Sequence, residues 1–297
     1  MELKQIKLVN CNLDVFRKML GISLTLAEKT DTLNITFNEK GLTGISSNRA
    51  DSLYKQWLIE WPILAESVTG LLEHVEASSA NGAKVQPLKC SIYKGEDFSK
   101  KILSFFGSVA DIVCFHDGKE IKQFQIQKKS TEGKVQLKID VVTASANLAF
   151  VDYSEELVKA LFTPESSSLV TKFNLGISDL QTVSSLSKLS VNPDKQTKYI
   201  TLYTENGQLK ATDNCFDVVL HEAAEAPLPE PLEIDKELWS KIDRDEYSVE
   251  LHAIEENKIL VCKSLTKHVT ESVALLAKTN DDINFDDFAA STEDFTV

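Results

Sequence analysis

The stretch Asn12-Leu13-Asp14-Val15-Phe16-Arg17-Lys18-Met19-Leu20 begins a pattern that decides the fold class. Its apolar residues recur at intervals of three and four, which is the spacing of one helix face. The run Thr32-Leu33-Asn34-Ile35-Thr36-Phe37 alternates polar and apolar residues as a strand does. Residues 42–46 alternate again after the polar turn Asn38-Glu39-Lys40-Gly41. A helix followed by a β-hairpin predicts an α+β fold.

The same helix-and-hairpin unit recurs three more times along the chain. The second helix opens at Asp97, which is suited to cap it, and Ser178-Asp179-Leu180-Gln181 at the start of the third matches a capping box. The second helix starts at Asp97 and is followed by the turn Asp117-Gly118. The third starts at Ser178 and is followed by Glu205-Asn206-Gly207. The fourth starts at Asp235 and is followed by Glu255-Glu256-Asn257-Lys258. The faces expected to be buried are Phe98, Ile102, Phe105 and Phe106 in the second helix, and Ile177, Leu180, Val183 and Leu186 in the third.

The distance from helix to turn alternates long, short, long, short, which indicates two similar domains with two units each. The stretch between them contains Pro164 and the loop signal Ser166-Ser167-Ser168. The expected segments are an N-terminal domain over 1–151, an interdomain connector over 152–172, a C-terminal domain over 173–279 and a flexible acidic tail over 280–297.

Composition excludes several classes of protein. Of the 297 residues, 42% are hydrophobic, which allows real cores and excludes global disorder. No apolar run reaches the roughly 20 residues of a membrane span, and the N-terminus lacks a signal-peptide pattern. The five cysteines form no CxxC pair, so neither a metal site nor a disulfide framework is expected, and a reducing cytoplasm fits. The net charge of −13 excludes nucleic-acid binding by the whole surface, but not by one basic face.

Four helix-and-hairpin units in two domains resemble the DNA polymerase sliding clamps, the family of the proliferating cell nuclear antigen and the T-even phage clamps. The resemblance is one of pattern and covers residues 2 to 278. Its most specific stretches are 16–20, 98–103 and the segment Ile177 to Leu220, which resembles the second domain of a phage clamp. It implies a DNA-clamp fold in which helices line a central hole and sheets lie outside. With two domains per chain it implies a homotrimer.

The function that this resemblance implies is that of a processivity factor. Such a ring encircles duplex DNA and tethers a DNA polymerase, and a clamp loader is a further expected partner. The phage-like second domain implies a bacteriophage source and the cytoplasm of an infected bacterial host. No cofactor and no membrane partner are expected.

The resemblance places the basic side chains of the four helices in the hole. Because DNA carries one negative charge per about 1.7 Å of axis, a sliding protein needs attraction without base contacts. Basic residues on all four helices of an acidic chain favour this role over simple solvation, although Asp14, Asp179 and Glu237 oppose it. The expected DNA-binding residues are Arg17, Lys18, Lys100, Lys101, Lys188, Lys236 and Lys241.

Two further surfaces follow from the resemblance. Subunits are expected to join by strand addition at residues 134–141 and 215–221, because edge strands expose unpaired backbone groups. The interface residues there are Val135, Leu137, Ile139, Phe216, Val218 and Val219.

A short polymerase peptide is expected to enter a pocket beside the connector. The residues expected to form this pocket are Leu157, Leu161, Phe162, Pro227 and Leu228. The alternative is that they only cover the domain junction. The tail, with Phe285, Phe288 and Phe295, is expected to compete for this pocket.

Three other functions compete with the clamp. An enzyme is disfavoured because no histidine lies in a motif with Ser or Cys, and the sequence has no GxGxxG, P-loop or HExxH, so no catalytic residue is expected. A monomeric clamp-fold processivity factor that never closes a ring shares all the features above, and its mass in solution distinguishes it. A single-stranded DNA-binding protein would place aromatic residues on a barrel, whereas here they lie on apolar helix faces.

Overall fold

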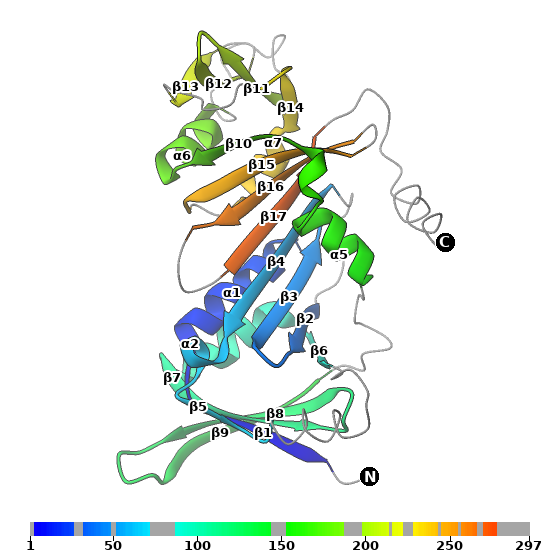
Figure 1. The fold of residues 1–297 in the computed structure, drawn as a ribbon. Helices are drawn as coiled ribbons and strands as arrows, with labels where there is room; N and C mark the ends of the chain where they lie inside the picture. Colours follow the sequence, from blue (N-terminus) through cyan, green and yellow to red (C-terminus); the bar gives the residue numbers. More distant parts are fainter. Residues whose placement is uncertain are drawn as a thin grey trace, which may run out of the picture. The chain divides into compact units, whose positions relative to one another are not determined.

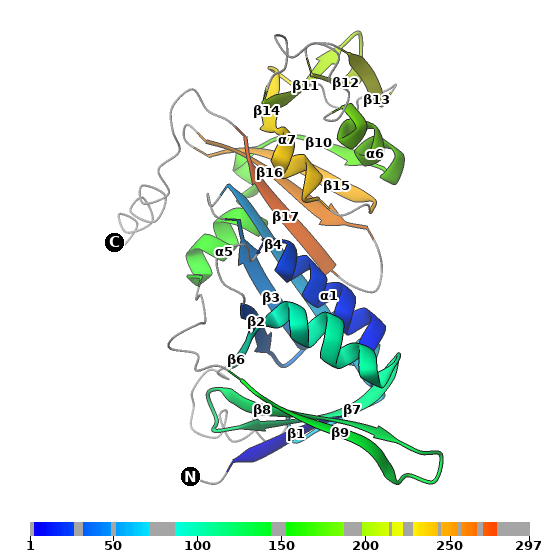
Figure 2. The same cartoon turned by 180° about the vertical axis from the view of Figure 1, so that it is seen from behind.

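A computed structural model describes residues 3–26, 32–48, 52–71, 87–143, 153–186, 198–213, 216–221, 228–242, 245–254, 257–265 and 270–277. The chain divides into two compact units, each of mixed helix and strand (Figures 1 and 2). Unit 1 comprises Met1–Arg49 and Gln56–Asp152, and unit 2 comprises Ala50–Lys55 and Tyr153–Val297. The mixed composition confirms the predicted α+β class.

Unit 1 contains a five-stranded antiparallel sheet with the strand order β5-β1-β7-β8-β9 (Figure 1). Its strands are β1 (Lys4–Asn12), β5 (Ser67–Thr69), β7 (Val109–His116), β8 (Ile121–Lys129) and β9 (Val135–Val142). A second group has the order β4-β3-β2-β6 and consists of β2 (Thr32–Phe37), β3 (Gly41–Ser47), β4 (Leu53–Glu60), whose first residues belong to unit 2, and β6 (Leu88–Tyr93).

Aromatic rings join the helices of unit 1 to its strands. The helices are α1 (Leu13–Leu26), the four-residue α2 (Trp61–Leu64), the π-helical η1 (Asp97–Ile102) and the 3-10 turn η2 (Leu103–Phe106). Phe16 of α1 meets Phe98 of η1 edge-on, with ring centroids 6.5 Å apart. Phe98 and Phe37 in turn lie 6.0 and 6.3 Å from Phe124 of β8. The apolar stripe of the first helix is therefore a true core face, as predicted, and Leu13, Phe16 and Leu20 are buried.

The second helical segment corrects one expectation. The sequence pattern predicts Phe105 on the buried face, but Phe105 is 71% exposed, whereas Leu103 and Phe106 are buried. The reason is that the segment is not α-helical: a wide π turn is followed by a tight 3-10 turn. In a 3-10 turn, residues three apart share a face, so Leu103 and Phe106 point inward together and Phe105 points outward.

Unit 2 contains two antiparallel groups of strands. One has the order β10-β15-β16-β17 and consists of β10 (Leu169–Leu175), β15 (Tyr247–Ile254), β16 (Asn257–Ser264) and β17 (Thr270–Leu276). The other has the order β13-β12-β11-β14 and consists of β11 (Tyr199–Glu205), β12 (Gln208–Thr212), β13 (Asp217–His221) and β14 (Leu232–Asp235). Between β11 and β12, Asn206 and Gly207 have φ values of 52° and 75°, which is the left-handed geometry that an Asn-Gly hairpin turn requires.

The helical segments of unit 2 are α5 (Glu155–Phe162), η3 (Ser166–Ser168), α6 (Ile177–Leu186) and α7 (Lys236–Ser240). Leu180, Val183 and Leu186 of α6 are buried as predicted, but Ile177 is 42% exposed. The predicted cap at Ser178 is also wrong, because the helix begins at Ile177 and the Asp179 carboxylate accepts from the Gly176 N–H at 2.6 Å. Ile177 thus lies in the first turn, outside the apolar stripe.

Each unit holds two helix-and-hairpin repeats, as the sequence pattern predicts. In unit 1, α1 precedes the hairpin of β2 and β3, and η1–η2 precedes β7 and β8. In unit 2, α6 precedes β11 and β12, and α7 precedes β15 and β16. Among the described residues, no helix is both long and apolar enough to cross a bilayer.

Candidate functional site

Three basic side chains stand out from the helices of unit 1. Lys18 is exposed on α1, and Lys100 and Lys101 of η1 have side chains that are 70% and 73% exposed. Each η1 lysine pairs with a carboxylate one turn earlier, Glu96 and Asp97, at 2.5 Å. Such exposed pairs are weak and are screened by salt, so phosphate oxygens can compete for both lysines. This surface can attract a polyanion.

Arg17 lies one residue from Lys18 but is placed differently. Its side chain is only 26% exposed and pairs with Asp14. One guanidinium nitrogen, Nη1, donates to the carbonyl oxygens of Leu103 at 3.2 Å and Gly107 at 3.0 Å. The group is therefore committed to two carbonyls of the η2 turn, one at its first residue and one at the glycine that follows it.

The basic residues predicted in unit 2 are less available. Lys236, the first residue of α7, has a side chain that is 19% exposed, with Nζ 3.7 Å from the buried Asp213 carboxylate. Lys241 is 11% exposed, and its Nζ lies 3.2 Å from Glu237. Lys188 lies outside the described residues. Among the predicted DNA-binding residues that are described, the most exposed are Lys18, Lys100 and Lys101.

Among the described strands, β9 is the last of its sheet, at the edge that the family resemblance implies. Thr143 N–H donates to the Lys122 carbonyl at 3.0 Å, so these two residues form a hydrogen-bonded pair. Bonded and non-bonded pairs alternate along an antiparallel ladder. The backbone groups of Lys138, Asp140 and Val142 consequently point away from β8 and outward. Of the predicted interface side chains here, Val135 is 50% exposed, and Leu137 and Ile139 are half-buried.

Strand β13 is likewise the last strand of its sheet. Asp213 N–H donates to the Phe216 carbonyl at 3.4 Å, and the same alternation directs the backbone groups of Asp217 and Val219 outward. Phe216 and Val219 are 40% and 44% exposed, and Val218 is half-buried. Both edges therefore combine outward-pointing backbone donors with apolar side chains.

The residues expected to bind a partner lie mostly inside unit 2. Leu161 and Phe162 of α5 are 1% and 3% exposed, in a cluster with Tyr54, Ile259, Val261 and Ala274. Leu157 packs on the same cluster but is only partly buried. Leu228 is 7% exposed, is not part of that cluster, and donates its N–H to Thr204 Oγ1 at 2.9 Å. Pro227 lies outside the described residues.

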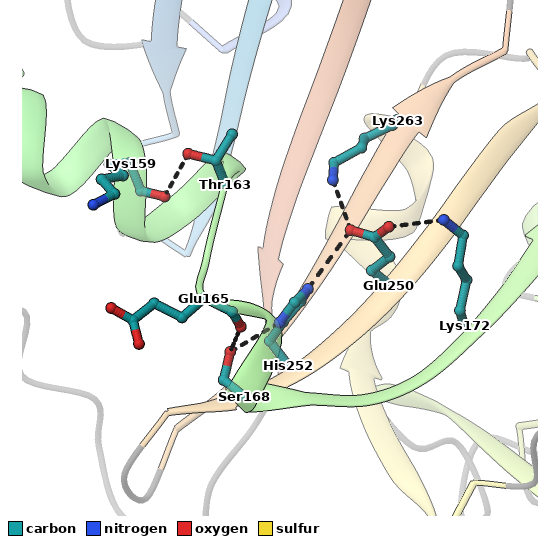
Figure 3. A network of polar contacts seen from close by, with 8 residues as sticks. All are labelled: Lys159, Thr163, Glu165, Ser168, Lys172, Glu250, His252 and Lys263. Atoms are coloured by element: carbon teal, nitrogen blue, oxygen red, sulfur yellow. Dashed lines mark hydrogen bonds and ion pairs between the residues drawn. The ribbon is translucent and has the colours of Figure 1, made fainter.

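A polar network joins η3 to strands β10, β15 and β16 (Figure 3). Glu250 of β15 accepts from Lys172 of β10 at 2.9 Å and from Lys263 of β16 at 2.6 Å. Burial alone would raise the pKa of Glu250, but the two ammonium groups lower it to about 2. Two residues along the strand, His252 is 3% exposed, and its Nδ1 lies 2.9 Å from Ser168 Oγ.

Counting hydrogens shows that Nδ1 of His252 carries a hydrogen in this network. Ser168 has one hydroxyl hydrogen, and its Oγ lies 2.7 Å from the Glu165 carbonyl, which can only accept. Both contacts of Ser168 are satisfied if His252 Nδ1–H donates to Oγ and O–H donates to Glu165. Nε2 of neutral His252 then carries a lone pair, 3.7 Å from the Glu250 carboxylate, and makes no hydrogen bond.

The order Ser, His and Glu resembles a hydrolase triad only superficially. The hydroxyl of Ser168 gives its hydrogen away from the imidazole, so His252 does not act as its base. The Glu250 carboxylate is held by two lysines instead of orienting the ring. The network therefore anchors η3 to the sheet. Ser168 and His252 are 84 residues apart, and only the pairing of β10 with β15 brings them together, so the sequence pattern did not reveal them.

Solved structures of proliferating cell nuclear antigens match nearly the whole chain. The structure described as the C-terminal region of FEN-1 bound to A. fulgidus PCNA matches with a TM-score of 0.59 and 10% identity, over 93% of this chain and 99% of that one. The Entamoeba histolytica protein gives 0.60 and 12%, over 94% and 100%. A PCNA2–PCNA3 complex from Sulfolobus tokodaii gives 0.56 and 13%, over 92% and 99%. The chain has a sliding-clamp fold.

At these identities the likeness concerns the fold alone. No family model matches the sequence, and no curated protein sequence matches it. Within the part of the chain that the structure describes, no group of three or more His, Cys, Asp or Glu side chains is arranged to hold a metal ion.

Acid is expected to destabilise unit 2 of this clamp fold through His252. Burial lowers the pKa of His252 below its usual 6.5, and this outweighs the opposing pull of Glu250. A depressed pKa means that the stability contributed by neutral His252 is complete above pH 6.5 and is lost as pH falls through the folded-state pKa. Glu250, with a pKa of about 2, stays ionised throughout this window.

His252→Gln tests this expectation, because glutamine keeps an N–H for Ser168 and does not titrate. The free energy of unfolding, measured by urea denaturation at about pH 7.5 and about pH 5, should fall more steeply in the wild type than in the variant. Equal losses in the two proteins would show that His252 does not carry the pH dependence.

Proposed function

We propose that this chain is one subunit of a sliding clamp, a closed ring that encircles duplex DNA and tethers replication proteins to it. The observation that carries the proposal is the sliding-clamp fold over more than nine tenths of the chain. Two similar units per chain favour three chains in the ring, as the sequence resemblance implies. The phage-like segment Ile177 to Leu220 further favours a bacteriophage clamp that acts in the host cytoplasm, with a polymerase and a clamp loader as partners.

Ring closure is supported by the two edge strands. Residues 138, 140 and 142 of β9 and residues 217 and 219 of β13 turn backbone groups outward, where a strand of another chain can pair with them. Exposed Val135, Phe216 and Val219 lie beside these edges. We therefore propose that β9 of one chain pairs with β13 of the next, and that Leu137, Ile139 and Val218 become fully buried in the contact.

DNA binding is supported by the exposed lysines of α1 and η1. A clamp must hold DNA of any sequence, and phosphate contacts carry no sequence information. Lys18, Lys100 and Lys101 supply such contacts in our proposal, while Lys236 and Lys241 contribute less because their side chains are only 19% and 11% exposed. Lys188 remains a proposed contact on the sequence pattern alone.

A partner peptide is proposed to bind over α5. One similar structure carries the C-terminal region of FEN-1 on a PCNA, which supports a peptide-binding role for the same fold here. Leu161 and Phe162 are buried, so we assign them to the floor beneath the site. Leu228 is buried outside that cluster and stays in the proposed site on the sequence pattern. Leu157, which is partly buried, is the proposed direct contact, and Pro227 stays in the proposed site on the sequence pattern. The tail over 280–297 is proposed to compete for this surface.

Leu157→Asp is expected to weaken binding of a polymerase C-terminal peptide by roughly tenfold or more, because it places a charge in an apolar contact. Fluorescence anisotropy with a labelled peptide measures this. Lys159→Ala is the matched control, since Lys159 is exposed on the same helix. Unchanged affinity in Leu157→Asp would move the peptide site away from α5. Deletion of residues 280–297 should raise peptide affinity if the tail competes.

The experiment that tests the proposed function compares circular with linear DNA. Dilution followed by concentration in the presence of a plasmid lets the chains assemble around the DNA. Gel filtration at raised salt should then retain protein on the circular plasmid and lose it from the same plasmid after linearisation, because a ring slides off open ends. Equal retention on both forms would favour the monomeric processivity factor that never closes a ring.

A further inference from the structure

A set of contacts ties the N-terminal end of α1 to the C-terminal end of the η1–η2 segment; we call it the helix clasp. Leu13 N–H donates to the Ser108 carbonyl at 2.8 Å. The Ser108 side chain hydrogen-bonds Asp14, which together with the Arg17 contact lowers the pKa of Asp14. Arg17 completes the clasp, because it holds Asp14 and donates to Leu103 and Gly107.

The chemistry of a helix end explains why arginine suits this position. The last carbonyl groups of a helix have no intrahelical partner, and a cation there is favourable. The segment ends at Gly107, with φ at 73°, after a π turn and a 3-10 turn that satisfy these groups poorly. A guanidinium presents several N–H groups in one plane, so it can reach two carbonyls and a carboxylate together, whereas a lysine ammonium is a point charge.

The position of the clasp links it to the proposed DNA surface. Lys100 and Lys101 lie in η1, directly before the turn whose end Arg17 holds. Their Cα positions and the direction of their side chains therefore depend on how the segment is held at Gly107. Lys18, next to Arg17 in sequence, is exposed, and among the described residues it makes no ion pair.

We infer that Arg17 is a positioning residue that holds η1 so that Lys100 and Lys101 meet the DNA backbone, and that it does not itself bind phosphate. This inference rests on the proposed function for its ligand. It assigns Arg17 a role different from that of Lys18, although the two are adjacent basic residues on one helix.

The test is a double-mutant cycle read out on DNA. Arg17→Lys keeps the charge and loses the planar fork. Binding of a short labelled duplex is titrated over a range of salt concentrations for the wild type, Arg17→Lys, Lys100→Gln/Lys101→Gln and the triple variant. We expect the double lysine variant to lower the salt slope by about two. Arg17→Lys alone should weaken binding measurably, and in the triple variant it should add no further loss, because its effect acts through the two lysines.

Lys18→Gln is the matched control, since it removes a neighbouring charge without touching the clasp. Its loss should be additive with that of Lys100→Gln/Lys101→Gln. Amide hydrogen exchange over residues 98–107 should be faster in Arg17→Lys than in the wild type and unchanged in Lys18→Gln. Ser108→Ala loosens the clasp from its other side and should give the same non-additive pattern if Arg17→Lys folds poorly.

Each of the following outcomes would contradict one step of the inference. Wild-type binding by Arg17→Lys, with weak binding by Arg17→Ala, would make Arg17 a direct phosphate contact. If the loss of DNA affinity in Arg17→Lys adds to the loss in Lys100→Gln/Lys101→Gln, the helix clasp does not act through these two lysines. If Lys100→Gln/Lys101→Gln leaves DNA binding unchanged, the proposed DNA surface itself is wrong, and the exchange data then show only whether Arg17 holds the helix end.

Discussion

Val219→Pro is expected to convert an assembly of three chains into single chains. The N–H of Val219 points away from β12, so proline removes a donor from the outer edge of β13 and leaves the pairing with β12 intact. An acceptor on the neighbouring chain is then buried without a partner, which costs about 1–3 kcal/mol at each interface of the ring. Light scattering at micromolar concentration measures the resulting mass.

The opposite edge and two control variants sharpen this test. Lys138→Pro removes an outward donor from β9 and should have the same effect on assembly. Val219→Thr keeps the N–H and should assemble as the wild type does. Val218→Pro removes an N–H that faces β12, so it should lower the thermal stability of unit 2 as well. An intact assembly in both Val219→Pro and Lys138→Pro would mean that the chains do not join through these edges.

Replacement of Lys18, Lys100 and Lys101 by glutamine is expected to cause the largest loss of DNA binding. These three side chains are exposed on the helices of unit 1. Each lysine that contacts a phosphate contributes about 0.9 to the slope of log affinity against log salt concentration, so the slope should fall by nearly three. The same loss should appear with duplexes of unrelated sequence, because phosphate contacts do not read bases.

The matched control for this variant is Lys236→Gln/Lys241→Gln in unit 2, where the lysine side chains are only 19% and 11% exposed. Its salt slope should change less per lysine removed. If the unit 2 variant loses more binding than the unit 1 variant, the duplex lies against α7 instead of α1 and η1, and the assignment of the DNA-facing lysines is reversed.

Much of the fold was predictable because its hairpins are local. The alternating run 32–37 coincides with β2, and the Asn-Gly turn lies where Asn206 and Gly207 have positive φ. Strands such as β1 and β6 escaped prediction because their partners, β7 and β2, are distant in sequence and no turn signal announces the pairing. Helical periodicity predicts the wrong face for Phe105, because a regular helical period does not describe a π turn followed by a 3-10 turn.

The positions of the candidate site residues were predictable, but their hydrogen bonds and exposure were not. Helical periodicity places basic residues on polar faces. It does not reveal that Arg17 donates hydrogen bonds to the carbonyls of Leu103 and Gly107, while Lys18 beside it stays exposed. That difference depends on the end of another helix, 86 residues along the chain from Arg17. The anchoring of Ser168 by His252 likewise depends on strand register, which sequence periodicity alone does not supply.

The mass of the wild-type protein in solution tests the ring most directly. Light scattering coupled to gel filtration at micromolar concentration measures it without DNA or partners. A clamp of two-unit chains predicts three times the chain mass of 33.1 kDa. A mass of 33.1 kDa at every concentration would contradict the ring and leave a clamp fold that acts as a single chain.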